Sequence, residues 1–186
     1  VKLMAKTTLD EFGKIDILVN NAGGSARERN RLFCQSSEEV WDYVLGINLK
    51  GVMNCCRAVI EHMMEQRSGK IVNIASTTGM VGTPGIGMAD YAAAKAGIIG
   101  FSQVLAKEVA AYGINVNCVS PGPVETRAML HMSSERKELF VKQSGLGRIG
   151  NPQDVAYLVA FLVSDEASFI TGQNYAVCGL TNLGIG

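Results

Sequence analysis

Residues 71–95 contain a short apolar run, a glycine-rich connector and a long alanine-rich stretch. The run 71–75 has the length and composition of a buried strand, and the stretch from residue 89 onward has the periodicity of a helix. Apolar runs at 15–20, 114–119 and 174–177 alternate with helical patterns at 36–66, 89–111 and 152–164. Such alternation is typical of a parallel sheet covered by helices. The sequence therefore predicts an α/β fold with a doubly wound parallel sheet, in a single domain of 186 residues.

Tyr91 and Lys95 lie four residues apart in the predicted helix, which places both side chains on one face, one turn apart. A free tyrosine has a pKa of about 10 and is a poor base at neutral pH. A positive charge within a few ångström favours the phenolate and lowers that pKa. Ser76 follows the strand 71–75, and ligands of open parallel sheets bind at the carboxyl ends of strands. These three side chains indicate proton exchange with an alcohol or a carbonyl.

The Tyr-x-x-x-Lys spacing alone is more often a tyrosine packed under a lysine stem, because any long helix can contain it. The surrounding segments favour a catalytic pair. Asn20-Asn21-Ala22-Gly23 ends the strand 15–20, Asn48 lies in the next helical stretch, and residues 120–126 follow the strand 114–119. In this order and spacing, over essentially the whole chain, the sequence resembles the short-chain dehydrogenase/reductase family of the compact single-domain kind.

The resemblance implies a Rossmann-like oxidoreductase that transfers a hydride between a nicotinamide cofactor and a secondary alcohol or ketone. It makes Tyr91 the general acid/base, while Lys95 lowers the pKa of Tyr91 and binds the nicotinamide ribose. Ser76 is expected to orient the carbonyl oxygen, and Asn48 to hold a water that links the lysine to solvent. The cofactor is NAD or NADP. The choice stays open, because the residue that distinguishes them in the family precedes the segment present here.

The resemblance also implies cofactor contacts at the ends of two strands and on the catalytic helix. The expected cofactor-binding residues are Asn21, Ala22, Gly23, Tyr91, Lys95, Pro121, Gly122, Val124 and Thr126. Family members carry strands and a glycine-rich pyrophosphate-binding turn before this point, so we expect the domain to be incomplete at its N-terminus. The strand 15–20, which reads as buried on both faces, would then be an uncovered edge that makes the 186-residue chain poorly stable or prone to aggregation.

Composition and charge restrict the classes of binding partner that we expect. Seventeen basic and seventeen acidic residues cancel, and no basic run suggests a nucleic acid or a membrane surface. No apolar run approaches the roughly 18 residues of a membrane-spanning helix. Five cysteines without a C-x-x-C pair, and two histidines, favour reduced thiols in a cytoplasmic protein over a disulfide or metal site. The family resemblance implies a homo-oligomer, a tetramer or a dimer, built on the helices around Cys55 and at 89–111.

Residues 145–150 match the dinucleotide-binding pattern G-x-G-x-x-G. That pattern has its meaning only after a strand and at the start of a helix. Here it follows a polar helical stretch, and the next helix begins only after Asn151-Pro152, a cap followed by proline. We therefore expect an ordinary loop.

Three functional hypotheses remain open. The first is reversible oxidation and reduction of a small secondary alcohol or ketone, with residues 126–143 as a lid over the substrate. The second is reduction of a 3-oxoacyl thioester on a carrier protein, in which Arg27, Arg29 and Arg31 would meet the carrier, although a solvated loop is the more common use of such arginines. The third is a catalytically silent nucleotide-binding or assembly subunit.

Overall fold

A computed structural model describes residues 1–26, 32–82, 87–129 and 132–181. Its centre is a parallel sheet of four strands in the order β1-β2-β3-β4. The strands are β1 (Ile17–Asn20), β2 (Gly69–Ile74), β3 (Ile114–Pro121) and β4 (Asn174–Val177). The predicted α/β class with a parallel sheet is confirmed, and each strand lies within two residues of its predicted bounds.

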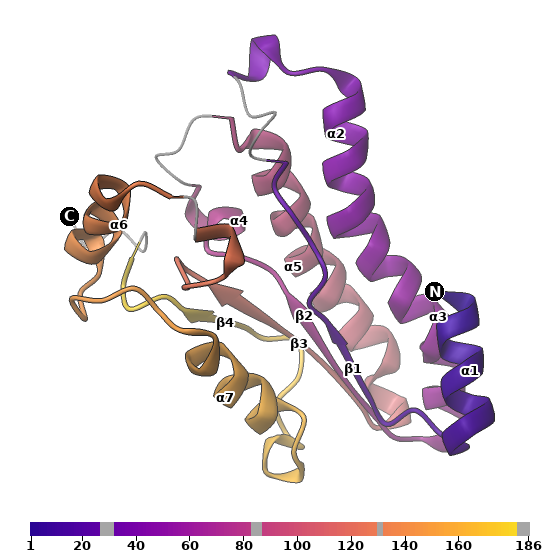
Figure 1. The fold of residues 1–186 in the computed structure, drawn as a ribbon. Coiled ribbons are helices and arrows are strands. Elements are labelled where there is room, and N and C mark those ends of the chain that lie inside the picture. The colour runs from indigo at the N-terminus through magenta and orange to yellow at the C-terminus, as the bar shows by residue number, and fades with distance from the viewer. Residues whose placement is uncertain (27–31, 83–86, 130–131, 182–186) are drawn as a thin grey trace.

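Helices cover both faces of this sheet (Figure 1). One face packs against α1 (Lys2–Phe12), α3 (Gly51–Gln66) and α5 (Ala89–Val109), and α2 (Glu38–Leu45) continues the line of α3. The other face packs against α7 (Pro152–Leu162). Neighbouring strand residues divide between the two cores, since Ile71 belongs to the first and Val72 to the second. This alternation is what a strand between two helical layers requires.

Short elements complete the carboxyl side of the sheet and the connections. They are the helices α4 (Thr78–Val81) and α6 (Ser134–Gln143), and the 3₁₀ turns η2 (Phe33–Gln35), η4 (Ala110–Tyr112), η5 (Arg127–Met129) and η6 (Asp165–Ala167). No helix within the described residues is both long and apolar enough to span a bilayer.

Strand β1 lies at the edge of the described sheet and is buried on one face only. Leu18 and Asn20 are buried, whereas Ile17 is 47% and Val19 41% exposed. The prediction of burial on both faces is therefore wrong for this chain. The physical reason is that α7 packs on β2 and β3 and leaves the corresponding face of β1 uncovered.

The predicted helix 36–66 is interrupted by a π-helical turn, η3 (Gly46–Lys50). Asn48 lies in this turn and is fully buried. Its side-chain Nδ2 donates to the backbone oxygen of Val44 at 2.8 Å and to that of Gly24 at 2.7 Å. An amide that competes for a helix carbonyl disturbs the regular ladder, which accounts for the wider turn. Such single π turns are frequent at functional sites.

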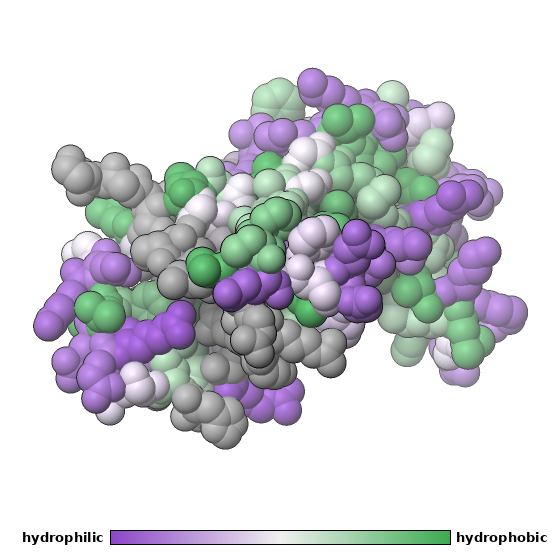
Figure 2. Space-filling view, turned by 90° about the horizontal axis from the view of Figure 1, so that it is seen from above, coloured by the Kyte–Doolittle hydropathy of each residue, from purple (hydrophilic) through white to green (hydrophobic). Residues whose placement is uncertain are grey.

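Hydrophobic side chains reach the surface in patches between hydrophilic ones (Figure 2). On the run from α2 into α3 they include Tyr43, Leu45, Ile47 and Met53, which are between 36% and 50% exposed. On α5, Val104 is 56% exposed. Large exposed apolar patches are a common feature of association surfaces.

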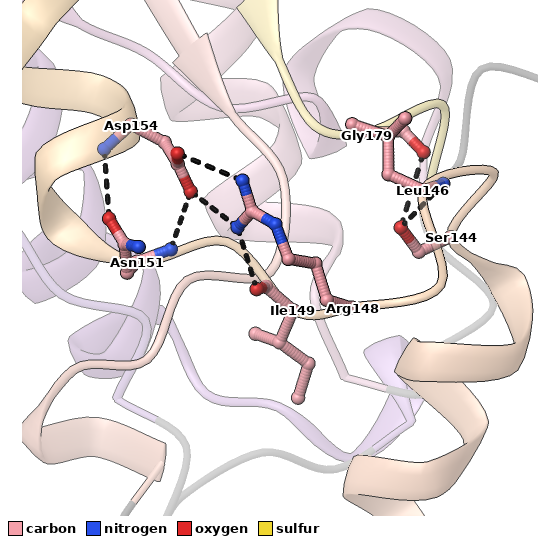
Figure 3. Close-up of polar contacts among 7 residues, drawn as sticks. All are labelled: Ser144, Leu146, Arg148, Ile149, Asn151, Asp154 and Gly179. Atoms are coloured by element: carbon pink, nitrogen blue, oxygen red, sulfur yellow. Dashed lines mark hydrogen bonds and ion pairs between the residues drawn. The ribbon is translucent and has the colours of Figure 1, made fainter.

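The segment 145–150 is a loop, as predicted, and it anchors the chain before α7 (Figure 3). Ser144 Oγ donates to the Gly179 oxygen at 3.3 Å and accepts from the Leu146 backbone N–H at 3.3 Å. The guanidinium of Arg148 donates to both carboxylate oxygens of Asp154, at 2.6 and 3.0 Å. This contact lowers the pKa of Asp154 to about 2.

Asn151 and Asp154 form a reciprocal cap at the start of α7 (Figure 3). The Asp154 N–H donates to Asn151 Oδ1 at 3.0 Å, and the Asn151 N–H donates to Asp154 Oδ2 at 2.8 Å. Each bond adds a side-chain acceptor for a backbone N–H at the start of the helix.

We expect Asn151→Ala to lower the free energy of unfolding by about 1 kcal/mol, because one end of this cap is lost. Asn151→Ser keeps a capping oxygen and serves as the matched control, with a much smaller loss. Urea unfolding curves of the two variants and the parent measure the difference. Equal stability of Asn151→Ala and the parent would show that the cap contributes nothing.

Candidate active site

The predicted catalytic residues come from three elements that meet at the carboxyl end of the sheet. Ser76 follows β2, Asn48 lies in the π turn between α2 and α3, and Tyr91 and Lys95 lie in the first two turns of α5. The inward stripe of α5 runs from Lys95 through Ile98 to Ser102, all of which are buried. Helix α5 was predicted correctly. Its first two turns lie near the carboxyl end of β2, since Lys95 contacts the Ile74 oxygen there.

Lys95 is buried in this stripe, with only 4% of its surface exposed. Its Nζ donates to the Ile74 backbone oxygen at 2.8 Å and lies 5.6 Å from the centroid of the Tyr91 ring. Burial lowers the pKa of Lys95 to about 8, because an ammonium without water around it is unfavourable. At neutral pH the group still carries most of its charge, beside the phenol ring.

Ser76 and the first turn of α4 pack against α5 at the level of Lys95. The hydroxyl of Ser76 accepts from the backbone N–H of Thr78 at 3.2 Å. Gly79 makes the approach possible, since a Cβ on it would lie 2.6 Å from the Ala96 nitrogen and 2.6 Å from the Lys95 carbonyl carbon. Real Cβ atoms do not come that close to backbone, so a side chain there would push the serine turn away from the helix.

Asn48 presents an oxygen beside the lysine that has no partner among the described residues. Both of its described hydrogen bonds come from Nδ2, and its buried Oδ1 accepts none from the described residues. A Cβ on Gly23 would lie 2.6 Å from this Oδ1 and 3.4 Å from Lys95 Nζ. The two polar atoms therefore border the same small space, which the lack of a side chain on Gly23 keeps free. A buried acceptor without a partner normally holds an ordered water or a ligand atom.

The expected cofactor segments occupy the same edge of the sheet. Asn21, Ala22 and Gly23 follow β1 and are exposed. Pro121 is the last residue of β3, and the Gly122 N–H donates to the Val177 oxygen at 3.0 Å.

After β3 the chain makes one more short strand-like pairing, outside the four-stranded sheet. Val124 forms a parallel bridge with Gly150, and Thr126 is exposed just before η5. The two connectors that the resemblance assigned to the cofactor thus follow strands of one sheet and leave it at one edge.

The expected lid 126–143 contains η5 and α6. It lies beside an open groove of about 550 Å³, lined by residues of the lid and of the loop before α7, among them Glu125, Lys137, Val141, Arg148 and Ile149. Within the expected lid, Met129 is buried. Residues 130 and 131, like Arg27, Arg29 and Arg31, lie outside the described residues.

Sequence reasoning missed several buried polar groups under the site. Thr77 donates from its Oγ1 to the Pro121 oxygen at 3.3 Å and joins the ends of β2 and β3. Asn73 and Ser102 are bonded to each other inside the core at 2.8 Å. The signal was present for Asn73, since an asparagine inside the apolar run Ile-Val-Asn-Ile needs a buried partner.

Comparisons with known proteins identify the family of the chain. A family model described as enoyl-(acyl carrier protein) reductase matches residues 1–181. The chain is 41% identical over 179 residues to the 3-oxoacyl-[acyl-carrier-protein] reductase FabG of Thermotoga maritima, which covers 96% of this chain and 71% of the relative. It is 45% identical, with the same coverage, to the protein of that name from Staphylococcus aureus (strain Mu50).

The fold is similar to a crystal structure of a 3-oxoacyl-[acyl-carrier protein] reductase from Brucella melitensis, with a TM-score of 0.89 and 35% identity. The match covers 96% of this chain and 67% of the other. Sequence and fold thus lead to the same answer. The chain belongs to the short-chain dehydrogenase/reductase family and is an oxidoreductase that uses NAD or NADP.

Proposed function

We propose that this oxidoreductase reduces the ketone of a 3-oxoacyl thioester, with Tyr91 as the proton donor. The two curated relatives named above carry that activity in their names. The observation that carries the mechanistic part is the buried ammonium of Lys95, 5.6 Å from the Tyr91 ring centroid. The broader substrate class is a secondary alcohol or ketone. The ketone of a 3-oxoacyl thioester is a specific case of that class.

Each catalytic residue has a role that follows from its surroundings. The charge of Lys95 favours the phenolate of Tyr91, so the tyrosine can give a proton to a carbonyl oxygen in reduction and take it back in oxidation. Ser76 donates a hydrogen bond to the same oxygen and fixes the carbonyl in place. The free oxygen of Asn48 holds a water beside Lys95, through which the proton is replaced from solvent.

A nicotinamide cofactor fits the space at the strand ends, and it supplies or accepts the hydride when bound. Gly23 leaves room beside Lys95 and Asn48 that a Cβ would fill, which suits a ribose hydroxyl near the ammonium. Asn21, Ala22, Pro121, Gly122, Val124 and Thr126 would border the remainder of the cofactor. The protein's part is to orient the ring against the carbonyl and to exclude water.

We also propose a cytoplasmic homo-oligomer of single-domain subunits. The exposed apolar residues on α2, α3 and α5 support association, as does the family. A tetramer or a dimer would cover them.

Tyr91→Phe keeps the ring and removes the proton, so we expect kcat to fall by about 10²- to 10⁴-fold while cofactor binding persists. Tyr157→Phe is the control, because Tyr157 is 71% exposed on α7. Steady-state reduction of a 3-oxoacyl thioester and cofactor titration by fluorescence measure both quantities. A parent protein that binds cofactor without turning over any ketone would instead be a silent nucleotide-binding subunit.

Neutralising Arg27, Arg29 and Arg31 together to Ser tests the carrier-linked substrate. We expect KM for a carrier-protein thioester to rise several-fold to about tenfold, because a single charge pair with an anionic partner contributes modestly to binding. The KM for a short, uncharged ketone should stay the same. Equal KM values for the carrier substrate in variant and parent would remove these arginines from carrier recognition.

The lowered pKa of Lys95 predicts a distinctive pH dependence of stability in the cofactor-free protein. The folded-state pKa of about 8 lies below the ordinary value of 10.5, so the unfolded chain binds more protons between these values. Stability should therefore rise as the pH increases through this window, by up to about 3 kcal/mol relative to Lys95→Met. Urea unfolding from neutral to alkaline pH measures this, with Lys107→Met, an exposed lysine of α5, as control. Parallel profiles for the parent and Lys95→Met would contradict a depressed pKa.

A further inference from the structure

Four polar side chains form a continuous cluster inside the core, below the active site. Asn20, Cys56, Asn73 and Ser102 are 7%, 2%, 0% and 1% exposed. Asn20 Nδ2 donates to Asn73 Oδ1 at 2.8 Å and to Cys56 Sγ at 3.4 Å. Asn73 Nδ2 donates to Ser102 Oγ at 2.8 Å, and Ser102 Oγ donates to the Ile98 oxygen at 2.7 Å. We call these four residues the core polar cluster.

Each member lies on an element that carries a group of the proposed site or directly adjoins one. Asn20 ends β1, three residues before Gly23, and Asn73 lies in β2, three residues before Ser76. Ser102 lies on α5, seven residues after Lys95. Cys56 lies on α3, which directly follows the π turn that holds Asn48. The cluster therefore joins β1, α3, β2 and α5 to one another at a single place.

From Asn20 through Asn73 to Ser102, each side chain donates a hydrogen bond to the next. Only one relative placement of these side chains satisfies all of the bonds. The Ser102 hydroxyl accepts from Asn73 and donates to its own helix, which uses the one proton it has. Shifting α5 along β2 would separate the Asn73 amide from this hydroxyl and leave buried polar groups without partners. Such groups are costly, whereas the apolar side chains around them can repack.

A second polar contact joins α5 and β2 at a point closer to the proposed site. Lys95 Nζ donates to the oxygen of Ile74, the residue after Asn73. Lys95 and Ser102 are separated by about 10 Å along the helix axis, since each residue of an α-helix adds roughly 1.5 Å. Two polar contacts at that separation oppose both sliding and rotation of α5 on the strand.

We infer that Asn73 and Ser102 are positioning residues, which fix α5 on β2 so that Tyr91 and Lys95 stand in register with Ser76. This inference rests on the proposed catalytic roles of those three residues. Neither Asn73 nor Ser102 touches the substrate, so their effect passes through the placement of the catalytic helix. A misplacement of about 1 Å is enough to cost on the order of 10²-fold in rate.

The test is Ser102→Ala in the complete protein. We expect kcat to fall about 10- to 100-fold with little change in KM, because Tyr91 and Lys95 lose their register while binding surfaces remain. The Tyr91 phenol should also titrate at higher pH, measured by ultraviolet difference absorbance against a Tyr91→Phe background. Ser102→Thr restores the hydroxyl and should recover most of both properties. Ser102→Cys keeps the volume with a weaker donor and should lie between Ala and the parent.

Val109→Ala is the matched control, because Val109 is 3% exposed on the same helix and lies outside the core polar cluster. It should lower the melting temperature while leaving kcat and the Tyr91 titration as in the parent. If Ser102→Ala behaves like Val109→Ala in all three measurements, Ser102 is merely structural and the inference is overturned.

The phenol titration does not depend on turnover, so it separates the two hypotheses. A parent without ketone reductase activity would remove the proposed function. In that case a higher titration pH of Tyr91 in Ser102→Ala would still support the positioning role, and an unchanged one would overturn it.

Discussion

The buried charge of Lys95 is the constraint on which the rest of the site depends. An ammonium with 4% exposure is unfavourable unless neighbouring polar atoms replace its water. The Ile74 oxygen supplies one such atom, and the space beside Asn48 and Gly23 has room for more. The same burial supports the proposed function, because a poorly solvated cation acts strongly on the nearby phenol of Tyr91.

The parallel sheet determines where the segments of the proposed site lie. Strands that all run the same way bring their carboxyl ends to one edge, so segments far apart in sequence meet there. Gly23 after β1, Ser76 after β2 and Gly122 after β3 each occupy that edge. Helix α5, which carries Tyr91 and Lys95, packs on one face of this sheet, and the lack of a side chain on Gly79 lets the turn after Ser76 approach it.

Apolar packing alone would hold α5 against the sheet without fixing its position along the strands. The core polar cluster adds directional contacts to that packing, on α5, which carries Tyr91 and Lys95, and on elements that adjoin Asn48 and Ser76. Buried hydrogen bonds of this kind select one arrangement among several that apolar side chains would accept. In the proposed site, stability and the placement of Tyr91 and Lys95 would therefore depend on one set of residues.

The sequence by itself determined the features that depend on local periodicity. The strands, the helix that places Tyr91 and Lys95 one turn apart, and the loop nature of residues 145–150 follow from spacing and from turn residues within a few positions. Only the tertiary structure decided how the charges and amides are surrounded. The π turn at Asn48, the one-sided burial of β1, the lowered pKa of Lys95 and the Asn73–Ser102 bond depend on partners many residues away. Burial and hydrogen-bond pairing are properties of the packed elements, and no local pattern in the chain specifies them.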